Sequence, residues 1–209
     1  MLRKRLVRGI VFAVLICGAV GAENIDPKDR GAQYAWGENV GWLNFEPAAG
    51  GVQVSQGRVT GFVWAENIGW ISLSCENTSS CGRVDFGVVN DGNGNLSGFA
   101  WGENVGWINF NPRAPGDTGN YGVRIDDAGR FEGWAWGENI GWIRFDATKA
   151  YNVRACVVTL EDLANFAEEW LAVGTSPANL YADGSVDMRD FSIFASRWLD
   201  FCPDGWRLK

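Results

Sequence analysis

Four near-copies of one eleven-residue phrase constrain this chain more than any other feature of its sequence. The copies are AWGENVGWLNF at 35–45, VWAENIGWISL at 63–73, AWGENVGWINF at 100–110 and AWGENIGWIRF at 135–145. Their first tryptophans follow one another at intervals of 28, 37 and 35 residues, which is the size range of stacked repeat units. The sequence therefore predicts a repeat architecture.

Each copy alternates between two kinds of side chain on both sides of a Gly/Asn turn, which is typical of a half-buried β-hairpin. In the last copy, Trp134 and Trp136 share one face, while Trp142 lies on the opposite face from Ile143 and Phe145. The apolar residues that correspond to this last pair are expected to form the core: Leu43, Phe45, Ile71, Leu73, Ile108, Phe110, Ile143 and Phe145.

A third short strand, ended by a glycine turn, precedes the later hairpins at 51–54, 84–89 and 121–125. The expected unit is therefore a three-stranded meander of about 35 residues. Residues 151–155 resemble 121–125, and their pairing beside the first hairpin would close four units into a ring, a barrel or a propeller-like structure without open edges. An open stack of hairpins fits the same pattern. The 28 glycines and the many turns argue against a helical fold for this region.

The Glu-Asn pair in each turn has two interpretations. In the first, the asparagine supplies a left-handed turn residue and the carboxylate accepts N–H bonds that hold the turn. In the second, the pairs are four equivalent sites for a cation or a sugar. Common turn chemistry favours the first interpretation. The pairs are Glu38-Asn39, Glu66-Asn67, Glu103-Asn104 and Glu138-Asn139.

Nine of the twelve tryptophans lie in the repeats, and they also have two interpretations. They fill the core of small β-repeats, where each aromatic side chain buries about 150 to 250 Å², or they form a surface that stacks on sugar rings. Repetition at equivalent positions favours packing, whereas exposure to solvent would favour a ligand surface.

The first 22 residues have the pattern of a secretory signal peptide. Four basic residues precede an apolar stretch at 10–20, which ends in the small-residue motif Val20-Gly21-Ala22. An uncleaved anchor is the weaker alternative, because the stretch is shorter than the roughly 20 apolar residues that span a bilayer. A lipoprotein site at Cys17 is disfavoured because Ile16 precedes it in place of a small residue.

Without this segment the chain is strongly acidic, with 14 Lys and Arg against 25 Asp and Glu. This balance argues against nucleic acid or an anionic membrane surface as the partner. The four remaining cysteines are consistent with two disulfides in an oxidising compartment. Their nesting favours Cys75 with Cys81 and Cys156 with Cys202, and a reduced metal-bound cluster is the weaker alternative.

From Thr159 the spacing of apolar residues becomes helical. The segments 160–171 and 188–199 are a second internal duplication, with Phe166 and Phe194, and Trp170 and Trp198, at corresponding positions. Apolar residues recur in each at i, i+3, i+4, i+7 and i+8. We therefore expect two amphipathic helices that pack together.

Residues 179–190, before the second helix, fit a twelve-residue calcium loop. The candidate ligands Asn179, Asp183, Ser185, Asp187 and Asp190 fall at positions 1, 5, 7, 9 and 12, with a glycine at the sharp turn. Hard oxygen ligands at these spacings suit Ca²⁺. This duplicated loop-helix pattern, with Asp at position 12, resembles the dockerin family and more narrowly the dockerin-like tails of secreted bacterial repeat proteins.

The resemblance implies a compact calcium-dependent module that docks its protein onto a cohesin-type partner. The sequence departs from the family pattern at Tyr181, which occupies ligand position 3, and at 151–162, where the first loop lacks its oxygen ligands and glycine. We therefore expect at most one bound Ca²⁺, and an acidic turn without metal is the alternative. A bridge between Cys156 and Cys202 would clamp the module and stabilise it by about 3 to 4 kcal/mol.

These features predict a signal peptide at 1–22, a four-repeat β domain at 23–155 and a dockerin-like helical module at 156–209. The predicted function is non-enzymatic attachment or display, outside the cell or at its surface. One rival is a carbohydrate-binding protein that uses the repeat tryptophans. The other is a glycosidase with a carboxylate pair such as Glu103 and Asp85. The second rival is disfavoured because a catalytic pair is a unique constellation, whereas these carboxylates come as four equal copies.

Overall fold

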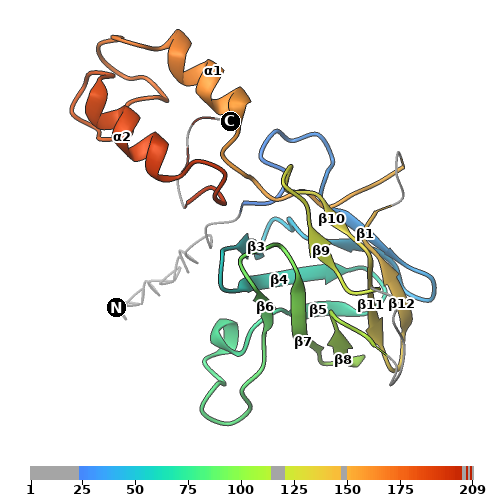
Figure 1. Ribbon diagram of the computed structural model, residues 1–209. Coiled ribbons are helices and arrows are strands. Elements are labelled where there is room, and N and C mark those ends of the chain that lie inside the picture. Colours follow the sequence, from blue (N-terminus) through green and yellow to red (C-terminus); the bar gives the residue numbers. More distant parts are fainter. Residues whose placement is uncertain (1–23, 114–120, 147–149, 204–205, 207, 209) are drawn as a thin grey trace, which may run out of the picture.

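The computed structural model describes residues 24–113, 121–146, 150–203, 206 and 208, so the predicted signal peptide lies outside the described residues. The described chain is mainly β, with a barrel of eight antiparallel strands and two short helices near the C-terminus (Figure 1). The helices lie to one side of the barrel. This confirms the predicted class, a mainly β chain with a small helical C-terminal part.

Four hairpins provide the eight barrel strands. They are β1 (Tyr34–Gly37) with β2 (Gly41–Asn44), β4 (Val59–Ala65) with β5 (Gly69–Ser72), β7 (Leu96–Gly102) with β8 (Gly106–Asn109), and β11 (Trp134–Gly137) with β12 (Gly141–Arg144). In each hairpin the two tryptophans stand opposite one another across the strands, as Trp36 and Trp42 do in the first.

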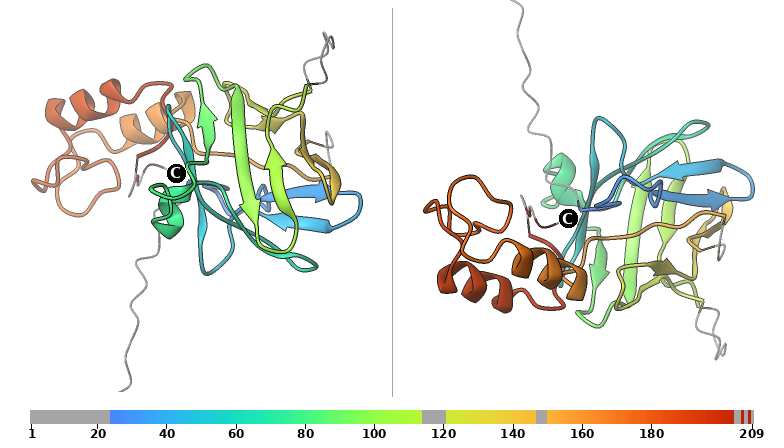
Figure 2. Two further views of the ribbon diagram at one scale, coloured as in Figure 1. Left: turned by 90° about the horizontal axis from the view of Figure 1, so that it is seen from below. Right: turned by 90° about the horizontal axis from the view of Figure 1, so that it is seen from above.

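Neighbouring hairpins pair edge to edge and close the ring. β2 pairs with β4, β5 with β7, β8 with β11, and β12 with β1, always antiparallel. The two views turned by 90° about the horizontal axis show the barrel strands around a common centre (Figure 2). Closure removes the unpaired edges that a row of hairpins would expose. The open stack that the sequence also allowed is therefore wrong.

A ring of side-chain hydrogen bonds joins the four hairpin turns. The amide nitrogen of the asparagine in each turn donates to a carbonyl in the turn of the preceding hairpin around the barrel, at 3.0 to 3.1 Å: Asn39 to Ile140, Asn67 to Val40, Asn104 to Ile68 and Asn139 to Val105. The left-handed turn residue is instead the following glycine, such as Gly41 at φ +79°. The prediction that asparagine occupies the left-handed position is wrong.

Four further short strands lie outside the four hairpins. They are β3 (Gly51–Val54), β6 (Val88–Asn90), β9 (Arg124–Ile125) and β10 (Phe131–Glu132). β3 pairs with the first half of β4, and β6 pairs with the first half of β7. Val153 pairs with Gln33, and the Tyr34 amide donates to the Asn152 carbonyl at 3.0 Å, which confirms the predicted pairing of 151–155 beside the first hairpin.

Three glycines let the chain bend at equivalent positions, within β4, within β7 and between β10 and β11. Gly61, Gly98 and Gly133 have φ between +85° and +96°. A Cβ on Gly61 would lie 1.8 Å from the Gly51 carbonyl oxygen, and the other two would lie 2.2 and 2.3 Å from the Gly87 and Gly122 oxygens. Only glycine fits where the strand bends this closely over its neighbour.

The eight apolar residues predicted for the core are all buried, each 3 % exposed or less. Their rings and branches meet inside the barrel, where Phe145 lies 5.4 Å from Phe45 and 5.7 Å from Phe110 between ring centroids. About 10 Å³ remains empty between these side chains. The barrel is therefore filled by its own side chains and holds no internal ligand cavity there.

The two helices, α1 (Leu160–Glu168) and α2 (Met188–Ser196), are shorter than the segments that the apolar spacing predicted. Leu171 and Leu199 adopt left-handed backbone at φ +66° and +60° and are exposed, so the last predicted turn is absent from both helices. Phe166 and Phe194 are buried and lie 5.4 Å apart, which confirms that the two helices pack together. The disulfide between Cys156 and Cys202 closes this small core as predicted.

Asn24 connects the barrel to the helical segment. Its side chain accepts a hydrogen bond from the Val54 amide at 2.8 Å and donates to the carbonyls of Val54 and Cys202 at 2.9 and 3.2 Å. Its own carbonyl accepts the Cys156 amide at 2.6 Å. An ion pair between Lys28 and Glu161 spans the same junction. The first and last described segments are thus bonded together.

Candidate functional site

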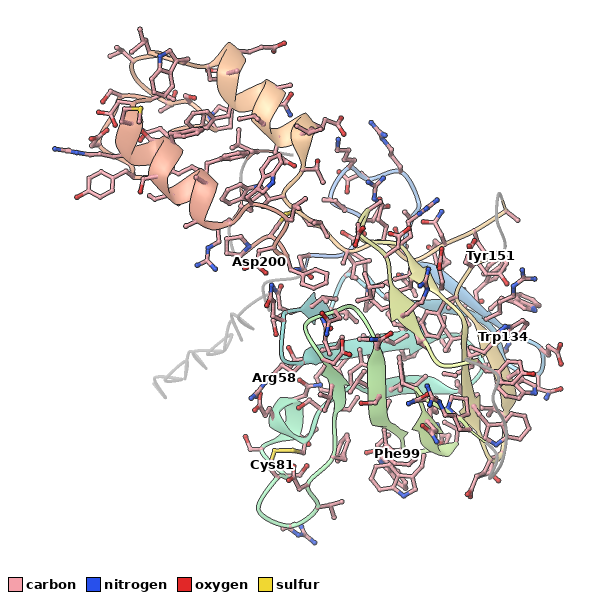
Figure 3. The ribbon with its side chains drawn as sticks, viewed as in Figure 1. Arg58, Cys81, Phe99, Trp134, Tyr151 and Asp200 are labelled. Carbon is pink, nitrogen blue, oxygen red and sulfur yellow. A yellow bond between two sulfur atoms is a disulfide. The ribbon has the colours of Figure 1, made fainter. Side chains whose placement is uncertain are left out.

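The outer face of the barrel carries four aromatic triads, which we call the outer belt. In the first, the Trp42 ring meets Trp36 at 4.7 Å and Tyr34 at 6.0 Å, both edge to face. The other three repeat this geometry at 4.5 to 4.9 Å and 6.2 Å: Phe62, Trp64 and Trp70; Phe99, Trp101 and Trp107; Trp134, Trp136 and Trp142. Phe99 and Trp134 can be located in Figure 3 at the outer surface of the barrel.

The belt tryptophans do not fill the core. Trp42, Trp70 and Trp107 are 47 %, 41 % and 37 % exposed, and Phe99 is 46 % exposed. Among the described residues, the buried core of the barrel is built from aliphatic side chains and phenylalanine. The interpretation that repetition of the tryptophans reflects core packing is wrong for this face. Contiguous exposed aromatics instead mark an interaction surface.

Two open grooves lie in the belt, each between adjacent hairpins. Groove A, between the first and second hairpins, has a volume of about 430 Å³. Groove B, between the second and third hairpins, has a volume of about 480 Å³. The side chains that matter most are Tyr34, Trp42, Asn44, Trp64, Glu66 and Tyr151 in groove A, and Phe62, Trp70, Ser72, Thr78, Trp101 and Glu103 in groove B.

The two grooves have the same construction, displaced by one hairpin. The second tryptophan of one hairpin and the first tryptophan of the next form facing walls, Trp42 with Trp64 in groove A. The turn glutamate of the later hairpin, Glu66, stands exposed beside them. Trp70, Trp101 and Glu103 play the same parts in groove B. Each groove therefore combines apolar walls with a carboxylate and short polar side chains, and no Lys or Arg is among the described residues that line them.

The hydroxyl groups that line the grooves come from different elements. In groove A the ring of Tyr151 lies 5.1 Å from Trp42, edge to face, and burial raises the pKa of the Tyr151 hydroxyl above its ordinary value. Groove B is lined by Thr78, the last residue of the short helix η1 (Cys75–Thr78). Each groove therefore offers a hydroxyl group, from a tyrosine in one and a threonine in the other.

At the other two hairpin junctions, further side chains pack on the belt. Phe86 meets Trp107 at 5.4 Å, Tyr121 meets Trp142 at 6.4 Å, and the guanidinium of Arg144 lies 5.4 Å above the ring of Trp134. Part of the aromatic surface there is thus covered by the protein itself. Grooves A and B are the better candidate sites.

The predicted calcium ligands are partly assembled. The Asn179 side chain is 8 % exposed and its Oδ1 has no hydrogen-bond partner among the described residues, so this oxygen is suited to serve as a cation ligand. Gly184 has φ +91°, as the sharp turn requires. Asp183, by contrast, accepts bonds from the Ser185 amide and hydroxyl at 3.1 Å and pairs with Arg189 at 3.3 Å.

The hydrogen bond from the Ser185 amide is the main cause that lowers the pKa of Asp183. Asp183 is therefore ionised at neutral pH, but a cation bound there would have to displace the Arg189 guanidinium.

Asp187 and Asp190 are engaged in capping α2. Asp187 accepts the Arg189 amide at 2.7 Å, and the fully buried Asp190 accepts the amides of Tyr181 and Asp187 at 2.7 and 2.9 Å. Asp162 makes the equivalent bond to the Thr159 amide at the start of α1, where no calcium loop precedes it. The duplicated aspartate thus has a capping role that does not depend on a metal.

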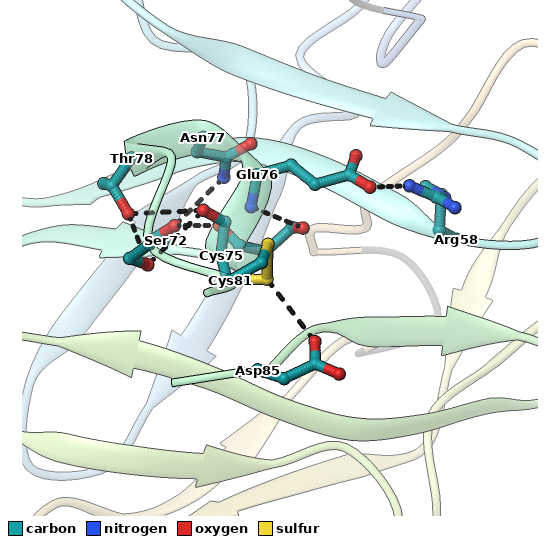
Figure 4. Close-up of a disulfide and its surroundings, with 10 residues drawn as sticks. Arg58, Ser72, Cys75, Glu76, Asn77, Thr78, Cys81 and Asp85 are labelled. Carbon is teal, nitrogen blue, oxygen red and sulfur yellow. Dashed lines mark hydrogen bonds and ion pairs between the residues drawn. A yellow bond between two sulfur atoms is a disulfide. The ribbon is translucent and has the colours of Figure 1, made fainter. Parts of the chain in front are cut away.

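The predicted disulfide between Cys75 and Cys81 is present, and Asp85 lies beside it with a carboxylate oxygen 3.6 Å from the Cys75 sulfur (Figure 4). Among the described residues, Cys75, Cys81 and Asp85 are the group whose possible ligand atoms lie close enough together to hold a metal ion. The two sulfurs are bonded to each other and offer no thiolate in this state. Glu103 lines groove B, whereas Asp85 is not part of its lining, so the suggested glycosidase pair does not share that groove.

Several groove residues were not predicted from the sequence, among them Asn44, Ser72, Thr78 and Tyr151. Comparison with protein-family models, with curated proteins and with solved structures finds no match for this chain. Within the part of the chain that the structure describes, neither helix has the length and apolar character needed to cross a membrane.

Proposed function

We propose that this chain is a secreted, non-enzymatic carbohydrate-binding protein, whose sugar ligands bind in grooves A and B. The observation that carries the proposal is the repeated pairing of two belt tryptophans and one glutamate across adjacent hairpins. The same construction occurring twice argues for a shared ligand chemistry. Exposure of Trp42 and Trp70 to solvent supports a binding role over a packing role.

The chemistry of the grooves suits sugars. A pyranose ring has an apolar C–H face, which stacks on an indole, and hydroxyl groups around its rim, which donate to carboxylate and carbonyl oxygens. Trp70 and Trp101 supply the stacking surfaces in groove B, and Glu103 supplies the acceptor. Small-molecule sites of this kind combine apolar walls with a few polar groups that fix orientation. Each lining holds a carboxylate and, within the described part of the chain, no Lys or Arg, which favours neutral over acidic sugars.

We further propose that the barrel consists of four three-stranded units, each a hairpin with its leading strand. Support comes from the common register of the hairpins and from the three equivalent bend glycines. Two disulfides support an extracellular location.

Tryptophan fluorescence tests the carbohydrate proposal. We expect a neutral glycan from a broad panel to quench the emission of the mature protein in a saturable manner. Trp70→Ala and Trp42→Ala should each weaken the response, because each removes a groove wall. Trp170→Ala is the matched control, since this tryptophan is 40 % exposed but lies at the end of α1. Absence of any response across neutral, acidic and amino-sugar glycans would refute the proposal.

As a second function, we propose that residues 156–209 form a dockerin-like module that attaches the barrel to a cohesin-like or other surface protein, with one Ca²⁺ held by the 179–190 loop. The unpartnered, buried Oδ1 of Asn179 is the observation that favours it. Calcium would supply charge neutralisation and rigidity to the loop. Asn179, Asp183, Ser185, Asp187 and Asp190 are the residues that would hold it.

Calorimetric titration tests this second proposal. We expect one saturable Ca²⁺ site in the wild type and none in Asn179→Ala/Asp183→Ala. This pair is preferable to a variant of Asp190, because loss of Asp190 would also remove the cap of α2. Asp162→Ala is the control, since it removes the corresponding cap of α1 without touching the loop. If the wild type gives no heat of binding at millimolar Ca²⁺, the calcium proposal is contradicted and the loop is an acidic turn that binds no metal.

A further inference from the structure

Grooves A and B share one ridge. Trp64 forms the inner wall of groove A and Trp70 the inner wall of groove B, and these two rings belong to the same hairpin. Their centroids are 4.8 Å apart, edge to face. A single edge-to-face pair of indoles therefore lies between the grooves, and the lining tryptophans follow one another along the belt in the order Trp42, Trp64, Trp70 and Trp101.

The two grooves lie at successive hairpin junctions of the barrel, β2 beside β4 and β5 beside β7. Successive hairpins are displaced by two strands, or about 9 to 10 Å at the usual inter-strand spacing. A ligand that fills one groove reaches the other only by extending along the belt, across the strands. A linear chain of sugars can extend in this way, whereas a single sugar ring or a branched end group cannot.

Among the described residues that line the two grooves, the charged side chains are glutamates. Glu66 and Glu103 are exposed, each beside its groove, and the pair is repeated at the same displacement as the tryptophans. A polyanionic chain would meet two carboxylates in succession. A neutral chain would meet two hydrogen-bond acceptors with the same relation to two stacking surfaces, which matches a polymer of repeated units.

We propose that grooves A and B bind one linear neutral polysaccharide chain together, at two positions along its interior, with the Trp64 and Trp70 ridge between them. The proposal rests on the carbohydrate function proposed above and narrows it to a ligand class. Once one groove is occupied, the second binds the same chain at a high effective concentration, so a chain that spans both grooves binds more tightly than a fragment that fills one.

Calorimetry with neutral cello-, xylo- and manno-oligosaccharides of increasing length tests this inference on the full mature chain. For the series that binds, we expect short members to occupy two sites per protein. Long members should bind as one chain per protein with an affinity at least about tenfold higher. Trp42→Ala, which damages only groove A, and Trp101→Ala, which damages only groove B, should each reduce short members to one site and abolish the gain with length.

Trp142→Ala is the matched control, because Trp142 holds the same register position in its hairpin, lines neither groove and packs on rings that line neither groove. It should retain both the stoichiometry and the gain with length. Equal affinity for short and long members, or a length gain that survives in both groove variants, would overturn the shared chain and leave the carbohydrate function standing. Failure of all three series to bind at any length, in a protein that does respond to another glycan, would also overturn it. Failure with every glycan would refute both proposals.

Discussion

The asparagine of each hairpin turn acts on its neighbour and not on its own hairpin. Its side-chain amide satisfies a carbonyl of the preceding turn around the barrel, and all four bonds together encircle one end. The glycine two positions later takes the left-handed backbone that the turn needs. In each turn the glycine therefore bends the chain, and the asparagine joins adjacent hairpins.

At the same scale, the bend glycines should tolerate no side chain. Gly61→Ala places a methyl group against the Gly51 carbonyl at φ +96°, so we expect a loss of at least about 2 kcal/mol in the free energy of unfolding. Urea denaturation monitored by fluorescence measures it. Gly57→Ala is the control, because a Cβ there meets no atom within 4 Å, and it should change stability by less than about 0.5 kcal/mol. Equal stability of both variants would contradict this account of the bend.

The alternation of side chains along each hairpin predicts both faces of the barrel wall, the inner core and the outer belt. The sequence places Ile143 and Phe145 in the core, and Trp142, one residue before Ile143, has the same parity as Arg144. If the first pair points inward, the tryptophan must point outward. The core was therefore predictable residue by residue, and so in principle was the outer belt. The grooves were not, because Tyr151 and Trp42 meet only after the ring has closed.

Among the elements, the tight turn between β6 and β7 depends on an ionised side chain. Asp91 accepts the amides of Asn93 and Asn95 at 2.8 and 3.0 Å and the side-chain amide of Asn95 at 2.8 Å. The last of these bonds contributes most to lowering the pKa of Asp91 below its ordinary value. The turn between β9 and β10 repeats the arrangement, with Asp126 accepting the amides of Ala128 and Arg130.

The lowered pKa makes this turn sensitive to acid. Because the folded pKa lies below the unfolded value, the stabilisation is complete above about pH 5 and is lost as the pH falls through the folded pKa. We expect the difference in melting temperature between wild type and Asp91→Asn to shrink between about pH 5 and about pH 2. Val173→Ala, an exposed change that removes no titratable group, is the control and should show no such trend. A difference independent of pH would contradict the assignment.

The helical elements show how far local pattern can predict length. The apolar spacing continued through Leu171 and Leu199, but both residues leave the helix with left-handed backbone. The Leu171 amide donates to the Val186 carbonyl instead, which ties the end of α1 to the segment before α2. The sequence therefore identified both helices and their contact. Their ends depend on pairing between the two copies, which no local periodicity contains.

In the whole molecule, the barrel and the helical segment have separate cores but a common junction at Asn24. This residue is 6 % exposed and contacts β3, the Cys156 amide and the Cys202 carbonyl through hydrogen bonds. Buried polar groups of this kind are costly to leave unpaired. The connection predicts that the two parts unfold together.

Asn24→Ala should separate them. The variant loses three side-chain hydrogen bonds and leaves the Val54 amide without this partner, so we expect a loss of about 3 kcal/mol in the free energy of unfolding. The helical circular dichroism signal should then fall at a lower urea concentration than the barrel fluorescence, whereas the two signals coincide in the wild type. Gln56→Ala, an exposed surface change, should leave them coincident. Coincident transitions in Asn24→Ala would show that the junction does not depend on this residue.

The pairing of β1 with β12 also determines when the barrel becomes complete during synthesis. Trp36 is paired with Arg144 across these two strands, so the outer edge of the first hairpin stays uncovered until the last hairpin has been synthesised. Until then a growing chain exposes a strand edge that can pair with another molecule, and contacts this distant in sequence form slowly. We therefore expect closure to be the slow step of folding, and dimers or aggregates formed through β1 to be the main by-product when the chain is produced too quickly.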